Sequence, residues 1–130
     1  MKFVFKSQSS IIIGKTILFL DRDGVVIEDT GYPIGIDKIK IKEKTIMKLL
    51  NFKKKHKLKI CGFITNQSGV SRNYFTENQF WDTHEFILSK CNKIGLKIDF
   101  TCVNFFVENS YFRKPNNGMI ETAINYYKAS

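Results

Sequence analysis

Short apolar runs alternate along the chain with longer stretches in which apolar residues recur at helical spacing. Residues 16–21, 58–64 and 98–103 are apolar runs of the length typical of strands buried on both faces. Residues 43–55 place apolar side chains three or four positions apart and end in lysines, which favours an amphipathic helix.

Two more helices are expected in the second half of the chain. Thr76 is a suitable N-cap for a helix that stops at Gly95, and a last helix is expected over residues 117–127. Strands that alternate with helices predict right-handed βαβ units, and therefore a parallel sheet with helices on both faces. In such sheets the functional residues gather beyond the carboxyl ends of the strands.

Composition limits the architecture further. A chain of 130 residues with 43% hydrophobic residues fits one domain over 1–130, with residues 1–15 as an N-terminal extension. No apolar run reaches the roughly 18 residues needed to cross a bilayer. The first residues also lack the pattern of a secretory signal, so a cytoplasmic protein without a membrane partner is expected.

Charge and cysteine content add little specificity. The net charge of +9 is compatible with attraction to phosphate or nucleic acid, but a solvated, lysine-rich surface is the favoured interpretation. Three cysteines without CxxC spacing argue against disulfides or a zinc knuckle and predict buried free thiols. His84 falls in an expected helix, where a surface or half-buried position is favoured over a metal-ligand role.

Polar residues follow the predicted strands where chemistry is expected. Asp21 and Asp23 come directly after the first strand, where one carboxylate can attack phosphorus and the other can transfer a proton. Two close acids also suit Mg²⁺. Thr65-Asn66 ends the second strand, and Lys114 follows the third, where it can balance the charge of nucleophile and phosphate. Taken alone, Asp-x-Asp-Gly would favour a turn that merely caps the next segment.

The combined motifs resemble a known family in order along the chain from about residue 16. They are Phe-Leu-Asp-Arg-Asp-Gly-Val at 19–25, Gly-Tyr-Pro at 31–33, Thr-Asn-Gln-Ser-Gly-Val at 65–70, Arg72, Phe-Thr at 75–76, and Arg-Lys-Pro-x-x-Gly-Met at 113–119. This pattern is similar to the haloacid-dehalogenase (HAD) superfamily, closest to its histidinol-phosphate and heptose-bisphosphate phosphatases. The resemblance implies an α/β, HAD-like (Rossmannoid) three-layer sandwich with a parallel sheet. The short stretch before residue 43 leaves no room for a large cap domain.

The resemblance also implies roles for individual residues. Asp21 would be the nucleophile and Asp23 the general acid and base, with Mg²⁺ held by the Asp21 carboxylate and the Asp23 main-chain oxygen. The remaining implied positions bind phosphate or face the substrate: Thr65 and Asn66 for phosphate, Lys114 for its stabilisation, and Arg72 and Arg113 for the substrate.

Two departures from the family pattern stand out. The region before Arg113 lacks the Cys and His residues of a zinc loop, so no zinc is expected. The chain also ends at Ser130, about where a fourth strand with a further metal-binding aspartate would begin, so the activity of the chain is in question. Without that fourth strand, the edge of the strand that carries Asp21 would be exposed. Residues 10–13 are expected to cover that edge, with self-association as the alternative.

Three functions follow as hypotheses. The first is a Mg²⁺-dependent phosphomonoesterase acting on a small sugar phosphate or related phosphorylated metabolite through an aspartyl-phosphate on Asp21. The second is a polynucleotide 3′-phosphatase, which the basic charge suits but which lacks a stacking platform, so nucleic acid is disfavoured as a partner. The third is a non-catalytic remnant that keeps the phosphate pocket.

Overall fold

A computed structural model describes residues 2–7, 16–107, 112–114 and 116–127. The strands are β1 (Phe3–Ser7), β2 (Ile17–Leu20), β3 (Ile60–Asn66) and β4 (Phe100–Asn104). The helices are the 3₁₀ turn η1 (Ile36–Lys38), α1 (Glu43–Lys55), α2 (Glu77–Ile94) and α3 (Gly118–Tyr127).

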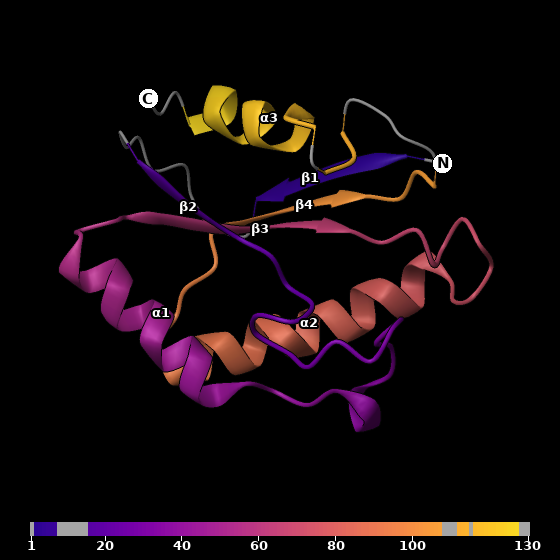
Figure 1. The fold of residues 1–130 in the computed structure, drawn as a ribbon, viewed down its shortest axis with the longest axis horizontal. Coiled ribbons are helices and arrows are strands. Elements are labelled where there is room, and N and C mark those ends of the chain that lie inside the picture. The colour runs from indigo at the N-terminus through magenta and orange to yellow at the C-terminus, as the bar shows by residue number, and fades with distance from the viewer. Residues whose placement is uncertain (1, 8–15, 108–111, 115, 128–130) are drawn as a thin grey trace.

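The described strands form one sheet in the order β1-β4-β3-β2. Strands β2, β3 and β4 are parallel, and β1 pairs with β4 in the antiparallel direction. Helices α1 and α2 cover one face of this sheet and α3 covers the other, which gives three layers (Figure 1). The predicted α/β architecture is therefore confirmed, and no cap domain is evident in the described part of the chain.

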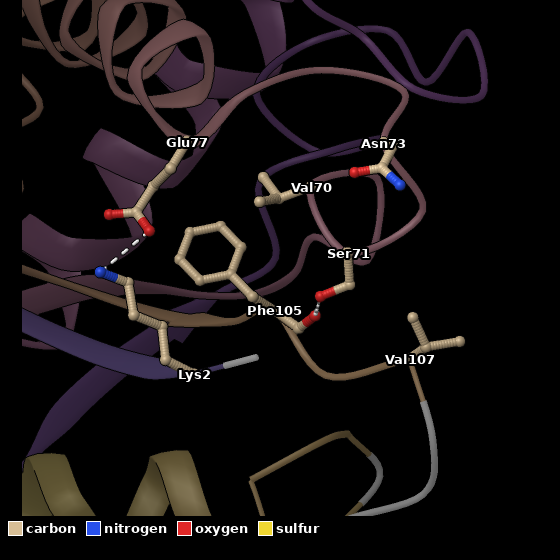
Figure 2. Close-up of a pocket in the computed structure, with 7 residues that line it drawn as sticks. All are labelled: Lys2, Val70, Ser71, Asn73, Glu77, Phe105 and Val107. Carbon is tan, nitrogen blue, oxygen red and sulfur yellow. Dashed lines mark hydrogen bonds and ion pairs between the residues drawn. The ribbon is translucent and has the colours of Figure 1, made fainter.

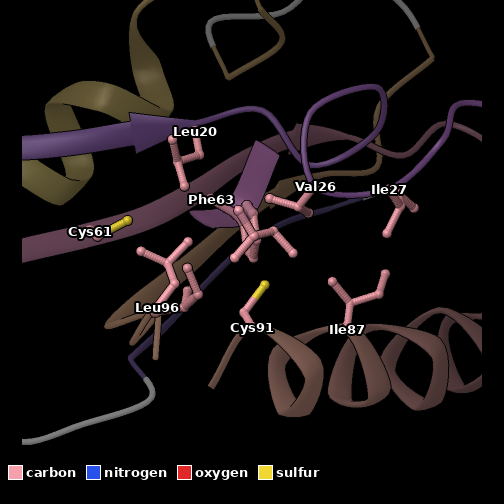
Figure 3. Close-up of a cluster of buried hydrophobic side chains, with 10 residues drawn as sticks. Leu20, Val26, Ile27, Cys61, Phe63, Ile87, Cys91 and Leu96 are labelled. Atoms are coloured by element: carbon pink, nitrogen blue, oxygen red, sulfur yellow. The ribbon is translucent and has the colours of Figure 1, made fainter. Parts of the chain in front are cut away.

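Side chains along β3 alternate between the two faces of the sheet, which explains why both faces are apolar. Cys61 and Phe63 point toward α1 and α2, where they join a buried cluster that includes Ile87 and Leu96 (Figure 3). Ile60 and Ile64 belong to the opposite cluster, which packs against α3. Successive residues of a strand face opposite sides, so a strand between two helical layers is apolar throughout.

Helix α2 has the boundaries that its sequence predicts. The Thr76 side chain accepts a hydrogen bond from the Gln79 amide, and the Gln79 side chain accepts one from the Thr76 amide. This reciprocal capping box satisfies two amides that the first helical turn would leave unpaired. The helix ends at Gly95, whose φ of 109° lies in the left-handed region that glycine adopts without strain.

The third predicted strand is displaced along the sequence. Strand β4 begins at Phe100 rather than at residue 98 and continues to Asn104. The reason is local: the buried carboxylate of Asp99 accepts a hydrogen bond from the Cys61 amide, and the Asp99 amide donates to the Cys61 carbonyl. Asp99 therefore joins the two chain segments before regular strand pairing starts.

The N-terminal extension forms a strand that the sequence analysis did not predict. Strand β1 lies beside β4, at the opposite edge of the sheet from β2. Residues 10–13, which were expected to cover the edge of β2, lie outside the described residues. Among the described strands, β2 pairs with β3 alone, so the strand that carries Asp21 is at an edge.

The cysteines are all buried and free, as predicted. Burial raises the pKa of each thiol, Cys61, Cys91 and Cys102, to about 12. No helix within the described ranges combines the length and apolar character needed to cross a membrane.

Candidate active site

The predicted site residues meet where β2 and β3 end. Asp21 follows β2, and Thr65 and Asn66 are the last residues of β3. Parallel pairing sets Leu20 opposite Phe63, so the residues beyond both strands lie at the same end of the sheet, where the parallel strands have their carboxyl ends. Lys114 reaches this end from the loop between β4 and α3 and forms an ion pair with the Asp21 carboxylate.

The Lys114 side chain is held from two sides. Its ammonium also donates a hydrogen bond to the Ile64 carbonyl over 3.0 Å, and its side chain is 27% exposed. Partial burial lowers the pKa of Lys114 below its usual 10.5. The Asp21 carboxylate, in contrast, is 55% exposed. The geometry thus places a cation against an accessible carboxylate, which suits the binding of an anionic group between them.

Asn66 connects the end of β3 to the Lys114 loop. Its side-chain oxygen accepts hydrogen bonds from the Lys114 amide over 3.2 Å and from the Asn104 side chain over 3.3 Å. Its side-chain nitrogen donates to the Lys114 carbonyl over 3.5 Å. Asn66 was predicted to bind phosphate, and that role stays a prediction; these contacts show that its amide fixes the loop that delivers Lys114.

Both carboxylate oxygens of Asp23 accept hydrogen bonds. Oδ1 accepts a hydrogen bond from Arg22 Nε over 2.7 Å, and Oδ2 accepts one from Gln67 Nε2 over 2.9 Å. The same Gln67 nitrogen donates to the Thr65 hydroxyl over 2.9 Å. Gln67 therefore joins two predicted site residues, Thr65 at the end of β3 and Asp23 in the loop after β2.

Gln67 and Arg22 received no role in the sequence analysis. A signal for Gln67 existed: Thr65 and Gln67 are two positions apart, and in extended chain such residues face the same side. Arg22 gave no such signal, since a charged residue in a loop is normally exposed and Arg22 is completely buried. His84, expected at the surface or half-buried, is also completely buried, so that prediction was wrong.

The loop after β2 folds back on itself. Gly24 has a φ of 88°, and its amide donates to the Ile27 carbonyl over 2.8 Å. The Lys42 ammonium binds the Gly24 carbonyl over 3.1 Å, which brings a further cation to this loop. Only a residue without a side chain adopts this backbone conformation without strain, so glycine is required at position 24.

The two predicted substrate arginines lie on loops around the site. Arg72 is exposed and donates from Nε to the Ser68 hydroxyl over 3.3 Å. Arg113 donates from Nη1 to the Phe106 carbonyl over 3.0 Å. Within the described residues neither arginine contacts Asp21 or Asp23, so the structure does not bring them to the reacting carboxylates.

The donor set of the site fits Mg²⁺. Asp21 and Asp23 supply hard oxygen atoms, and Mg²⁺ commonly takes one or two carboxylates with water and substrate phosphate completing its shell. The described residues contain no cluster of three or more His, Cys, Asp or Glu side chains that could hold a metal. Residues 108–111, in the region compared with a zinc loop, lie outside the described part. Cys102 is buried and its thiol faces the Met119 carbonyl at 3.7 Å.

A cavity of about 570 Å³ opens at the same end of the sheet (Figure 2). Val70, Phe105 and Val107 form the apolar part of its lining, and polar side chains form the rest. Ser71 donates a hydrogen bond to the Phe105 carbonyl over 2.6 Å. An ion pair of 2.9 Å between Lys2 and Glu77 closes one side. The size falls within the range of small-molecule sites, although none of the predicted site residues lines it.

Comparison with known proteins agrees with this geometry. The family model described as polynucleotide kinase 3 phosphatase matches residues 16–130. A probable D-glycero-D-manno-heptose-1,7-bisphosphate 7-phosphatase from Thermoplasma acidophilum is 30% identical over 116 residues, covering 88% of this chain and 71% of the relative. The histidine biosynthesis bifunctional protein HisB of Legionella pneumophila (strain Lens) is 35% identical over 116 residues, covering 83% of this chain. This chain spans about a third of the length of that relative (31%).

Two solved structures share the fold. A protein from Mesorhizobium loti described as HAD-like superposes with a TM-score of 0.85 at 23% identity, covering 98% of this chain and 65% of the other. The D,D-heptose 1,7-bisphosphate phosphatase from B. bronchiseptica, complexed with magnesium and phosphate, gives a TM-score of 0.74 at 22% identity. That match covers 86% of this chain and 63% of the other.

Proposed function

Because the chain belongs to the polynucleotide kinase 3 phosphatase family, we propose that it hydrolyses phosphomonoesters of small sugars or related metabolites. The observation that carries this proposal is the Lys114–Asp21 ion pair beyond the end of β2, with the Asp23 carboxylate held by Arg22 and Gln67 two residues further along the chain. An accessible carboxylate beside a fixed cation is the arrangement that in-line attack on phosphorus requires.

In the proposed reaction, an Asp21 carboxylate oxygen attacks phosphorus and forms an aspartyl-phosphate while the bond to the leaving oxygen breaks. Protonated Asp23 gives its proton to that leaving oxygen. The Asp23 carboxylate then takes a proton from water as the water oxygen attacks phosphorus. This second step releases inorganic phosphate, regenerates Asp21 and leaves Asp23 protonated for the next cycle.

Lys114 balances the negative charge that Asp21 and the phosphoryl group bring together, and Thr65 offers its hydroxyl to a phosphate oxygen. Mg²⁺ would be held by the Asp21 carboxylate and the Asp23 main-chain oxygen. When bound, the ion neutralises phosphate oxygens and orients the ester for attack.

The names of the relatives support a sugar phosphate as substrate. Two of them, from Thermoplasma acidophilum and Haemophilus influenzae, are named as phosphatases of a heptose bisphosphate. The cavity beside the loop after β3 has both polar and apolar lining residues and offers room for the organic part of such an ester. A polynucleotide 3′-phosphate is the second candidate, because the matching family model carries that description.

A direct comparison of substrates tests the proposal. Phosphate release is measured from a heptose bisphosphate, histidinol phosphate and a 3′-phosphorylated oligonucleotide, with magnesium and with a chelator. Asp21→Asn should abolish release, whereas Asp82→Asn, an exposed position on α2, should leave it unchanged. Beryllofluoride should form an adduct on Asp21, detected by fluorine NMR. Release that survives Asp21→Asn would show that the nucleophile is misassigned.

A further inference from the structure

A charged side chain is buried beneath the active site. Arg22 is 0% exposed, and its guanidinium carbon lies 5.0 Å from the centre of the Phe80 ring. Its Nε donates to Asp23, and its Nη2 is buried with no hydrogen-bond partner among the described residues. Removing a guanidinium from water costs several kcal/mol unless its surroundings compensate. The few groups that contact Arg22 must therefore compensate for the removal of its charge from water.

His84 supplies the other contact. Its Nδ1 lies 3.3 Å from Arg22 Nη1, and its Nε2 lies 2.8 Å from the Thr101 hydroxyl. The imidazole also stacks on Phe80, with centroids 5.4 Å apart and an interplanar angle of 12°. Helix α2 and strand β4 thus hold the ring from both sides, and its position is fixed.

Hydrogen-bond chemistry determines the state of this imidazole. A guanidinium nitrogen can only donate, so Nδ1 must accept and cannot carry a proton. The single ring proton is then on Nε2, which donates to Thr101. Burial, together with the Arg22 charge, lowers the pKa of His84 well below its usual value, in agreement with a neutral ring.

We propose that His84 is a positioning residue for Asp23: its neutral Nδ1 holds Arg22, and Arg22 orients the Asp23 carboxylate. The inference rests on the proposed phosphatase function. Arg22 fixes Oδ1 of Asp23 and Gln67 fixes Oδ2, so the carboxylate has one orientation when both partners are in place. Without the His84 acceptor, Arg22 has a second unpaired nitrogen in the core and must turn away from Asp23.

The choice of leaving group distinguishes a positioning role of His84 from a general effect of its substitution on protein stability. An alkyl phosphate needs a proton on its departing oxygen, and general acid catalysis contributes about 10²–10⁴-fold to such steps. p-Nitrophenyl phosphate releases a stabilised phenolate and needs little protonation. Loss of Asp23 orientation should therefore slow formation of the aspartyl-phosphate from the alkyl ester and leave its formation from the aryl ester nearly unchanged, whereas loss of folded protein lowers both equally. The later hydrolysis of the aspartyl-phosphate uses Asp23 as base for either ester, so the first turnover is the step to compare.

The test compares two polar replacements of the same ring. The amide oxygen of His84→Asn occupies the place of Nδ1 and preserves the acceptor, while His84→Gln places its polar group near Nε2 and removes that acceptor. For a hexose phosphate, the first-turnover rate of hexose release by the Gln variant should fall about tenfold or more, with the Asn variant within about threefold of wild type. Both variants should retain the first-turnover rate of p-nitrophenolate release within about threefold. His56→Asn, on an exposed histidine, is the matched control.

Nitrogen-15 NMR of the wild-type chain tests the same network without mutation. The His84 ring should show a proton on Nε2 and none on Nδ1. A proton on Nδ1, an equal fall in the first-turnover rate for both esters, or identical behaviour of the Asn and Gln variants would overturn the inference. A wild-type chain that hydrolyses neither these esters nor a heptose bisphosphate or histidinol phosphate refutes the proposed function itself, and the positioning role falls with it.

Discussion

Gly62 lies at the centre of the sheet, and adding a single methyl group there should destabilise the fold. A Cβ at this position would overlap three atoms of the Phe100 ring, which faces Gly62 across the β3–β4 pairing. Phe100 cannot move aside easily. It is fully buried, with Phe5, Phe19 and Tyr127 rings at centroid distances of 5.6 to 5.9 Å.

The expected magnitude follows from two opposing terms. Overpacking a rigid core costs about 1–3 kcal/mol. Replacing glycine by alanine returns about 0.4–1 kcal/mol by restricting the unfolded chain. The net loss for Gly62→Ala is therefore about 1–2 kcal/mol, which corresponds to a fall in Tm of roughly 5–10 °C for a chain of this size.

A double-mutant cycle identifies the cause. Urea unfolding is measured for wild type, Gly62→Ala, Phe100→Leu and the double variant. Leucine lacks the ring atoms that the new methyl group would meet, so Gly62→Ala should cost less in the Phe100→Leu background. If the two losses simply add to within about 0.5 kcal/mol, the Phe100 ring is not the reason for glycine at position 62.

Three further outcomes are expected. Lys114→Met should lower kcat about 10²–10³-fold in the phosphate-release assay, as loss of a charge-stabilising donor does, whereas Lys59→Met on the exposed surface should not change it. Thr76→Ala should lower the unfolding free energy by about 1 kcal/mol because the α2 cap is lost, and Thr76→Ser should retain most of it in the same urea titration. The three thiols have a folded pKa of about 12 against 9.0 in the unfolded chain. Their contribution to the unfolding free energy is therefore complete below pH 9 and is lost as pH rises toward 12. Each should remove about 1.4 kcal/mol per pH unit in that window, and unfolding free energies that stay level from pH 8 to 10 would contradict this.

The sequence predicted the fold where local pattern and burial agree. Residues 60–65 of β3 are buried at every position because helices cover both faces, and the α2 boundaries follow from Thr76 and Gly95. Asp21 and Lys114, far apart in the chain, were expected together because parallel strands end at one edge. These features depend on periodicity and on the direction of strands, both of which a single sequence records.

Other features depend on contacts between distant segments, which a single sequence does not record. Nothing in Phe3–Ser7 indicates that it pairs with β4 instead of lying beside β2. Arg22 is buried because Phe80, His84 and Asp23 surround it. Phe80 and His84 belong to α2, far along the chain from Arg22, and their apolar and helical spacing alone does not show that they enclose an arginine. The displaced start of β4 likewise reflects the pairing of Asp99 with Cys61.

The antiparallel direction of β1 has a practical consequence for experiments on this protein. The Lys2 carbonyl accepts a hydrogen bond from the Phe105 amide over 2.9 Å, and the Lys2 side chain pairs with Glu77 beside the cavity. An affinity tag fused ahead of Lys2 would therefore emerge next to the region where a substrate is expected to enter. Activity measurements should be made after proteolytic removal of such a tag, because a blocked entrance would otherwise be mistaken for an inactive enzyme.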